Sequence, residues 1–387
     1  MIELLFWTAV AVLAYTWVGY GLLAALLVRL RGDRPAPPPF ADDAAWPEVT
    51  LVIPAYNEEA FIAEKLANSL ALDYPAGKLD VVVVADGSTD RTFEIARSTP
   101  GVVAFRRPER RGKVAAMNRV MAHVTAPVVA FTDANAMLAP DALRQLVAPF
   151  TDPTVGAVAG EKRVAGGGGG AASEGLYWRY ESALKRLDSR LGSVVGAAGE
   201  LFALRTPLYR TLDEDTLLDD FVLSLRVAEQ GLRVAYAPDA AAIEGPSASL
   251  ADEWTRKVRI CAGGWQAMTR LRGLLNPFRH GLLTLQYVSH RVLRWTLAPA
   301  LLPLVLGLNV ALAATSPAYG LLLGLQLAFY TVAALGWALR DAAVPLRGFR
   351  LPLYVVFMHA AVFPGLVRFL TGRQSVNWVR AERAAHG

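Results

Sequence analysis

Cysteine and histidine are scarce in this sequence, and their scarcity excludes several kinds of site. Cys261 is the only cysteine, so the sequence has no internal disulfide and no cysteine-rich metal centre. A single thiol is compatible with a reducing compartment but does not require one. The five histidines do not follow metal-ligand spacing, and we interpret each as a structural or surface residue: His123, His280, His290, His359 and His386.

Motifs of nucleic-acid binding and of phosphate loops are missing as well. The sequence has no helix-turn-helix, zinc or RNP signature, and the glycine run 166–170 lacks the strand-to-helix setting of a phosphate loop. The net charge of +5 is modest, and many arginines stand next to long apolar runs. A membrane surface explains these arginines better than a nucleic acid does.

Apolar residues make up 54% of the sequence, because long hydrophobic runs occupy both of its ends. The uncharged run from Leu4 to Val28 is long enough to cross a bilayer of roughly 30 Å hydrocarbon thickness. Arg29, Arg31 and Arg34 follow it directly. By the positive-inside rule we predict a transmembrane anchor over residues 1–30, with the following residues in the cytoplasm.

Three further apolar or amphipathic regions follow residue 249. In residues 250–295 arginines alternate with Trp254, Trp265 and Met268, which is typical of amphipathic helices in the membrane interface. The stretches 296–314 and 318–339 predict a helical hairpin across the membrane. The stretch 351–370 is apolar too, but Pro352, His359 and Pro364 interrupt it.

The predicted spans conflict with the charges at the end of the sequence. One span before residue 49 and three after residue 295 would place the last residues outside the cell. Four arginines favour the cytoplasmic side instead: Arg368, Arg373, Arg380 and Arg383. We therefore predict that the last segment is re-entrant or interfacial, that it breaks at Pro364, and that residues 371–387 form a basic cytoplasmic tail.

The middle of the sequence alternates between buried strands and amphipathic helices. A proline-rich linker over residues 31–48 leads to predicted strands at 49–53, 81–84, 102–105 and 128–131, with a further one at 155–159. Asn57 is a candidate N-cap of the first helix, and a helix is predicted from Leu218 to Gln230. Short loops between strands and helices predict a doubly wound, mostly parallel α/β domain over residues 49–249.

Acidic side chains follow several of these predicted elements. Asp86, the pair Asp133 and Asn135, and the pair Asp219 and Asp220 each come at the end of a strand or at a turn. In open α/β sheets the ligand binds beyond the carboxyl ends of the strands. Oxygen ligands there suit Mg²⁺ or Mn²⁺ on a diphosphate, and a further carboxylate could act as a general base. Each residue taken alone could equally cap a helix or form a turn.

Together these motifs resemble the processive-type family 2 glycosyltransferases. The resemblance is carried by Ile53-Pro-Ala-Tyr-Asn-Glu-Glu59, Ala85-Asp-Gly-Ser-Thr-Asp90, Gly112-Lys113 with Asn118, Thr132-Asp-Ala-Asn135 and Leu218-Asp-Asp220. The family comprises GT-A enzymes and includes cellulose, hyaluronan and poly-N-acetylglucosamine synthases. The similarity covers residues 49–264 and the flanking membrane segments.

The resemblance implies a role for each matching residue. Ala55, Tyr56 and Glu58 would line the base and ribose of a nucleotide-sugar, Asp86 would bind the nucleoside, and Lys113 would lie near the donor. Asp133 and Asn135 would hold Mg²⁺ or Mn²⁺. Asp220, beside Asp219, would be the general base of an inverting transfer, and Gly199 and Glu200 would lie near the acceptor.

The implied reaction moves a sugar, most simply from a UDP-sugar, to a growing polysaccharide or a lipid-linked glycan at the cytoplasmic membrane face. Single transfer to a polyprenyl phosphate or another lipid is an alternative. A homo-oligomer or a separate exporter could move the product. A non-catalytic scaffold subunit is a hypothesis of another class, but Asp133 and Asp220 are both retained. A transporter is disfavoured because the spans are few and carry no acidic residue.

Two features depart from the family pattern. The usual Asp-x-Asp is Asp133-Ala-Asn135, which has one charge fewer, and the Gln-x-x-Arg-Trp motif is absent. The nearest equivalent runs from Arg256 to Gln266. Arg256 and Arg259 are either diphosphate partners or lipid-headgroup contacts, and Trp265, next to Gln266 in the predicted acceptor region, is either a sugar-stacking platform or an interfacial anchor.

Overall fold

The computed structural model describes residues 1–32, 38, 40–165, 169–245, 249–339 and 349–377. The predicted proline-rich linker, the glycine run 166–170 and the predicted basic tail lie partly outside these ranges. Arg34, Arg380, Arg383 and His386 lie wholly outside them.

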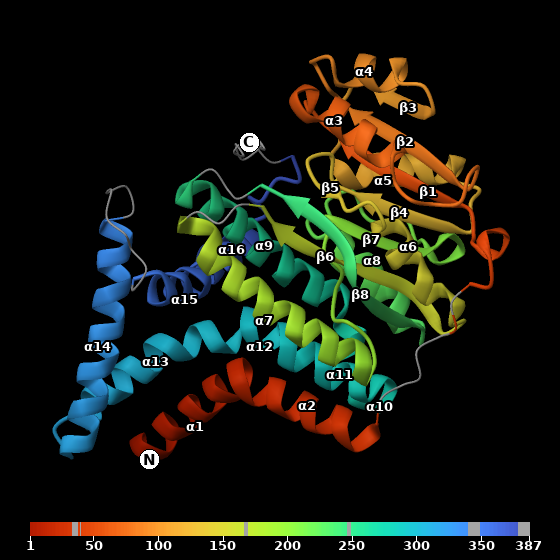
Figure 1. Ribbon diagram of the computed structural model, residues 1–387. Helices are drawn as coiled ribbons and strands as arrows, with labels where there is room; N and C mark the ends of the chain where they lie inside the picture. Colours follow the sequence, from red (N-terminus) through yellow and green to blue (C-terminus); the bar gives the residue numbers. More distant parts are fainter. Residues whose placement is uncertain (33–37, 39, 166–168, 246–248, 340–348, 378–387) are drawn as a thin grey trace.

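The first half of the molecule is built on one eight-stranded sheet, in the order β3-β2-β1-β4-β7-β6-β8-β5 (Figure 1). β1 (Val49–Ala55) pairs in parallel with β2 (Leu79–Asp86) and with β4 (Val128–Thr132), and β2 pairs in parallel with β3 (Val102–Arg107). β7 (Leu201–Arg205) is antiparallel to both β4 and β6 (Val155–Val164). β8 (Arg233–Glu244) is parallel to β6 and carries the short β5 (Met137–Leu138) at the edge. The predicted mostly parallel α/β fold is confirmed.

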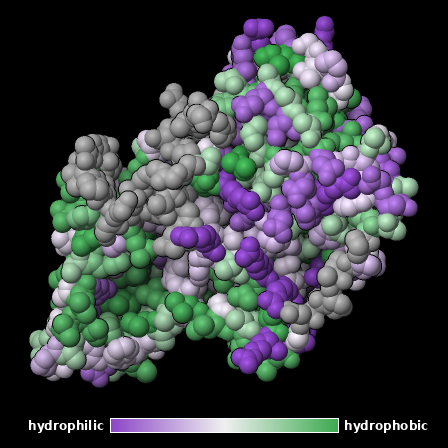
Figure 2. All heavy atoms as spheres, viewed as in Figure 1, coloured by the Kyte–Doolittle hydropathy of each residue, from purple (hydrophilic) through white to green (hydrophobic). Residues whose placement is uncertain are grey.

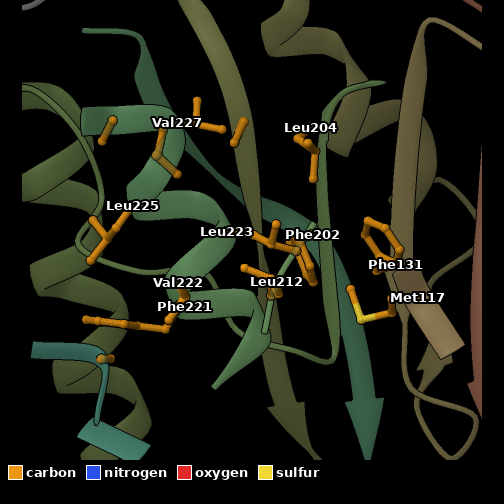
Figure 3. Packing of buried hydrophobic residues seen from close by; sticks show 14 of the residues in the cluster. Met117, Phe131, Phe202, Leu204, Leu212, Phe221, Val222, Leu223, Leu225 and Val227 are labelled. Atoms are coloured by element: carbon orange, nitrogen blue, oxygen red, sulfur yellow. The ribbon is translucent and has the colours of Figure 1, made fainter. Parts of the chain in front are cut away.

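Helices cover both faces of this sheet, and their apolar sides form the core. They are α3 (Glu59–Leu70), α4 (Thr92–Ser98), α5 (Lys113–Val120), α6 (Ala142–Val147) and α8 (Asp219–Glu229). Figure 3 shows Leu223 of α8 pointing toward the strands that carry Phe131 and Phe202, while Phe221 and Leu225 point to the other side of the helix. The rings of Phe131 and Phe202 stack with their centroids 5.2 Å apart. Because β4 and α8 share this core, the residues at their ends are held in fixed relative positions.

Asn57 does not cap the first helix, contrary to the prediction. α3 begins at Glu59, and Asn57 adopts a left-handed backbone conformation with φ of 52°. Its side-chain oxygen accepts a hydrogen bond from the backbone N–H of Thr89, at 2.8 Å. Asparagine tolerates this backbone region better than most residues, and here it ties the end of β1 to the loop after β2.

The apolar ends of the chain form a second, helical half. Within the described ranges three helices are long and apolar enough to cross a membrane: Ile2–Arg31, Pro317–Ala338 and Leu351–Leu370. A fourth would be added if the bent pair Leu282–Trp295 and Leu297–Leu312, which meet at 53°, counted as one span. Figure 2 shows that hydrophobic side chains dominate the surface over α1 (Ile2–Ala14), α13 (Leu297–Leu312) and α14 (Pro317–Ala338), while hydrophilic residues are frequent over the sheet.

The last apolar stretch is not interrupted at Pro364. It consists of α15 (Arg350–Ala360) and α16 (Val362–Leu370), which join at Ala361. Pro364 lies in the first turn of α16, where a missing N–H removes no helical hydrogen bond. The predicted break is therefore misplaced, and the side of the membrane on which this segment ends stays a prediction.

α9 (Leu250–Arg270) is a packed internal helix rather than one lying on a surface. Val258 is fully buried, and with Cys261, Ala361 and Val362 it forms one apolar cluster between α9 and the start of α16. The placement of residues 250–295 in the membrane interface stays a prediction. α9 thus connects the sheet to the apolar helices.

Gly196 offers a test of how tightly α8 is packed. Its φ is +90°, and a Cβ there would lie 2.2 Å from the Phe221 ring. We expect Gly196→Ala to cost about 1–3 kcal/mol more free energy of unfolding than Gly77→Ala does. Gly77 is the matched control, since its φ is +76° but no atom lies within 4 Å of an added Cβ. Melting temperatures of the purified variants check this, and equal shifts would contradict the packing described here.

Candidate active site

A cavity of about 960 Å³ opens at the carboxyl ends of β1, β2 and β4, and it brings most of the predicted site residues together. Parallel strands end at the same edge of a sheet, which is why residues from distant motifs meet there. The predicted residues that line the cavity are Ala55, Tyr56, Glu58, Asp86, Lys113, Asp133, Asn135, Gly199, Glu200, Asp219, Asp220, Arg256 and Arg259.

At one end of the cavity Asp86 holds a basic loop in place. Its carboxylate accepts hydrogen bonds from the backbone N–H groups of Arg111 (2.8 Å) and Gly112 (2.5 Å) and from the Arg119 guanidinium (2.8 Å). The guanidinium of Arg110 lies 3.5 Å from the centre of the Tyr56 ring. This flat pair is suited to stacking on a planar base. The sequence motifs did not point to Arg119 as a partner at this end.

Lys113 stands at the centre of the site. Its ammonium lies 2.8 Å from Asp133 Oδ1, at the end of β4, and 3.3 Å from Asp219 Oδ2, at the start of α8. These carboxylates raise the pKa of Lys113, against the opposing effect of burial. A Cβ at Gly199 would lie 3.3 Å from Lys113 Nζ and 3.4 Å from Asp220 Oδ2. The glycine therefore leaves room in front of the central charges.

Asp220 has the electrostatics of a general base. Burial raises its pKa to about 7, the negative charge of Asp219 adds to this, and Lys113 opposes it. A carboxylate with a pKa near the working pH both ionises and accepts a proton effectively. The predicted role of Asp220 therefore fits its surroundings.

A buried network connects the predicted metal and acceptor residues. The Asn135 amide nitrogen donates to Glu244 Oε1 at 3.1 Å. Lys162 Nζ lies 2.5 Å from Glu244 Oε2 and 2.5 Å from Glu200 Oε1, and its ammonium holds the pKa of Glu200 down at about 2. Sequence motifs did not reveal Lys162 and Glu244, because these residues lie on β6 and β8 and meet only through strand pairing.

A second buried lysine supports the turn that carries Asp133 and Asn135. Lys65 on α3 is fully buried and donates to Thr132 Oγ1 at 3.0 Å and to the Ala136 carbonyl. Burial lowers its pKa to about 7. Thr132 Oγ1 in turn donates to the Glu200 carbonyl at 2.8 Å. Both ends of the turn are thus fixed to the interior.

The turn that carries Asp133 and Asn135 fits a divalent cation that is held partly by the protein and partly by the phosphates of a substrate. Among the described residues no three histidine, cysteine or acidic side chains gather as a metal site. Asp133 and Asn135 would supply two oxygens, which matches Mg²⁺-type sites that complete their coordination with phosphate and water. A carboxylate accepts only, so Glu244 keeps the Asn135 nitrogen on its side and leaves the amide oxygen for the cation.

Trp265 and Gln266 are not found where the prediction placed them. Of the described residues, neither is among those that line the cavity. Trp265 packs against the core cluster, and Gln266 accepts from Leu217 N–H (2.9 Å) and donates to the Asp215 carbonyl (2.8 Å). Gln266 thus contacts the loop before α8, and Trp265 faces the core.

Arg256 and Arg259 both reach the cavity. Arg256 pairs with Glu253 at 2.8 Å, one turn earlier on α9. Arg259 donates to the Leu217 carbonyl at 3.2 Å, and burial lowers its pKa while Asp219 and Asp220 oppose that effect. Arg259 therefore lies near Asp219 and Asp220, and its role as a diphosphate partner stays a prediction.

Asn135 provides a test of the buried network. Asn135→Asp would restore a second carboxylate, yet it would place that group about 3 Å from Glu244 with no proton between them. We expect the single variant to need about tenfold more metal than the wild type for half-maximal activity. It should need less metal than the wild type only if Glu244 is neutralised. The double variant Asn135→Asp with Glu244→Gln should recover metal activation, and a gain in the single variant would contradict the predicted repulsion.

Comparisons with known proteins agree with this arrangement. A family model described as "Glycosyltransferase like family 2" matches residues 47–263. A beta-monoglucosyldiacylglycerol synthase from Synechocystis sp. is 30% identical over 67% of this chain and 59% of its own length. A poly-beta-1,6-N-acetyl-D-glucosamine synthase from Staphylococcus aureus is 26% identical over 57% of this chain and 56% of its own. The chain thus spans only between half and three fifths of the length of these curated relatives.

One solved structure is similar over nearly the whole chain. It is the mannosyltransferase PcManGT from Pyrobaculum calidifontis in complex with GDP-Man and Mn²⁺. The likeness covers 97% of this chain and 100% of that one, with 26% sequence identity and a TM-score of 0.73. Because the family match extends over more than half of the chain and includes the strands, turns and acids of the cavity, this protein belongs to the family 2 glycosyltransferases.

Proposed function

We propose that the chain transfers one sugar from a nucleotide diphosphate donor to a lipid acceptor, with inversion at the anomeric carbon. The observation that carries this proposal is the position of Asp220, whose pKa is near 7, beside Lys113 in the cavity that Asp133 and Asn135 also line. The mannosyltransferase similar to this chain binds GDP-Man, whereas the motifs favour a UDP-sugar. The donor panel below includes both.

In the proposed reaction Asp220 takes the proton of the accepting hydroxyl as its oxygen attacks the anomeric carbon. The bond from that carbon to the diphosphate breaks on the opposite face, and the nucleoside diphosphate leaves. Lys113 and Arg259 stabilise the negative charge that develops on the leaving group. A divalent cation held by Asp133 and Asn135, when bound, would supply further stabilisation of that charge.

A lipid acceptor is supported by the far wall of the cavity. Trp17, Met358 and Val362 line it, and they belong to the candidate spans Ile2–Arg31 and Leu351–Leu370. An amphiphile can therefore reach the acids while its tail stays among apolar helices. The curated relatives include a synthase of a glucosyl lipid. We place the cavity at the cytoplasmic face because arginines follow the first span.

A growing polysaccharide is the second candidate acceptor. It is favoured by the similarity to a poly-beta-1,6-N-acetyl-D-glucosamine synthase. The two candidates differ in product length, since a lipid acceptor gains one sugar and a polysaccharide gains many. Mass spectrometry of the products separates them.

The Asp220→Asn variant tests the base. We expect it to lose about 10²- to 10⁴-fold in the rate of nucleoside diphosphate release, because an amide cannot take the proton. Reconstituted protein would be assayed with membrane lipid extract and UDP-glucose, UDP-N-acetylglucosamine, UDP-galactose or GDP-mannose, each with Mn²⁺, Mg²⁺ or EDTA. Asp239→Asn, an exposed carboxylate on β8, is the control. Full activity in Asp220→Asn would remove this residue from the mechanism.

The pH profile tests the environment of Asp220. The base must be ionised, so kcat/KM should rise as the pH increases through about 7 and level off above it. Asp219→Asn removes the neighbouring negative charge and should move the midpoint to lower pH, by roughly half to one unit. Asp239→Asn should leave the midpoint in place. A midpoint that stays near 7 in Asp219→Asn would show that another group titrates.

A further inference from the structure

The cavity continues beyond the catalytic acids to one face of α7 (Gly169–Leu191) that the transfer step does not use. Trp178, Glu181 and Lys185 follow each other at three and four residues, so they lie on the same side of the helix. All three line the cavity. Figure 1 shows α7 running between the sheet and the apolar helices, and it packs against α2 (Tyr20–Arg31). This face therefore lies where the two halves of the molecule meet.

Lys185 is buried in that wall without a hydrogen-bond partner in the described part of the chain. Its side chain is 2% exposed, and among the described residues its ammonium has no hydrogen-bond acceptor. Its nearest aromatic neighbours are the rings of Tyr236, at 5.7 Å, and Trp178, at 5.8 Å. A buried ammonium that lacks an acceptor is costly to the fold, and such a group in the wall of a cavity favours a ligand that supplies one.

Glu181, one turn before Lys185 on α7, does not accept a hydrogen bond from Lys185, because its carboxylate is already paired with other groups. Glu181 lies 2.5 Å from Arg294 Nη1 and 3.3 Å from Arg291 Nη1, and it also contacts His290 at 3.2 Å. Arg294 has a donor to spare, since its Nε lacks a partner within the described part of the chain. Arg294 is 7% exposed and also lines the cavity. Two cationic side chains in the cavity wall thus carry buried donors that no described residue accepts from.

The surroundings of these donors are apolar on the side away from the acids. The Trp17 ring lies 4.7 Å from the Arg294 guanidinium, and Trp17 packs against His359 with ring centroids 5.1 Å apart. Met358 and Val362 continue the wall. An anionic group with an apolar tail matches this sequence of surfaces better than a free anion or a neutral lipid does.

We propose that Lys185 and Arg294 bind the phosphate of a lipid acceptor, whose tail lies along Trp17, Met358 and Val362. This inference rests on the proposed transfer to a lipid and names the class of that lipid as a phosphate ester. The accepting hydroxyl lies on the Asp220 side of the phosphate. Glu200 lines the same cavity as Lys185 and Asp220.

The test is a binding comparison on the full chain in a phosphate-free detergent. Calorimetry would measure citronellyl phosphate, citronellol and inorganic phosphate with the wild type, Lys185→Gln, Lys185→Arg and Arg179→Gln. Arg179 is an exposed cation on the same helix and serves as the matched control. We expect the wild type to bind the phosphate ester at least tenfold more tightly than the alcohol or the inorganic ion. Lys185→Gln should lose about ten- to a hundredfold of that affinity, while Lys185→Arg and Arg179→Gln keep most of it.

Three results would overturn the proposal. They are equal binding of the phosphate ester and the alcohol, equal binding of the ester and inorganic phosphate, and unchanged affinity in Lys185→Gln. Nucleotide-sugar binding and the melting temperature of each variant show whether that variant is folded. If Lys185→Gln is not folded, the comparison of the three ligands on the wild type decides the question. The calorimetric measurement needs no turnover. A wild type that binds the ester but transfers no sugar to the membrane lipid extract would therefore contradict the proposed function alone.

Discussion

The ammonium group of Lys113 is the contact on which the site depends. It lies between Asp133 at the end of β4 and Asp219 at the start of α8, so one charge holds together two elements that are far apart in the chain. Without it, Asp133, Asp219 and Asp220 would repel each other in a partly buried space. Lys113 also limits how far the pKa of Asp220 rises, which keeps that carboxylate able to ionise near neutral pH.

The interior around these acids is unusually rich in paired charge. Lys65 supports the turn of Asp133 and Asn135 from below, and Lys162 joins Glu244 to Glu200 on the neighbouring strands. Both of these buried lysines have polar partners, which offset the cost of desolvating their charge. The resulting network fixes the orientation of Asn135 and the position of Glu200 together, so the predicted metal site and the predicted acceptor site form one rigid unit.

The two halves of the molecule meet along α7 and α9. α9 packs on α16, and α7 packs on α2, so the cavity has a polar wall from the sheet and an apolar wall from the candidate spans. This construction suits a reaction in which a water-soluble donor meets an amphiphilic acceptor. Lys65 and Lys162 have hydrogen-bond partners, whereas Lys185 has none among the described residues, and it is this contrast that supports the proposed phosphate site.

The sequence by itself determined the α/β class, the apolar ends and the acids at the strand ends, because these follow from local periodicity and from short motifs. Asp86, Asp133 and Asp220 could be named in this way. Only the tertiary structure decided that Glu244 and Lys162 support Asn135, that Trp265 faces the core, that α9 is buried, and that Lys185 and Arg294 share a cavity wall. These contacts join segments that are remote along the chain, so no local pattern records them.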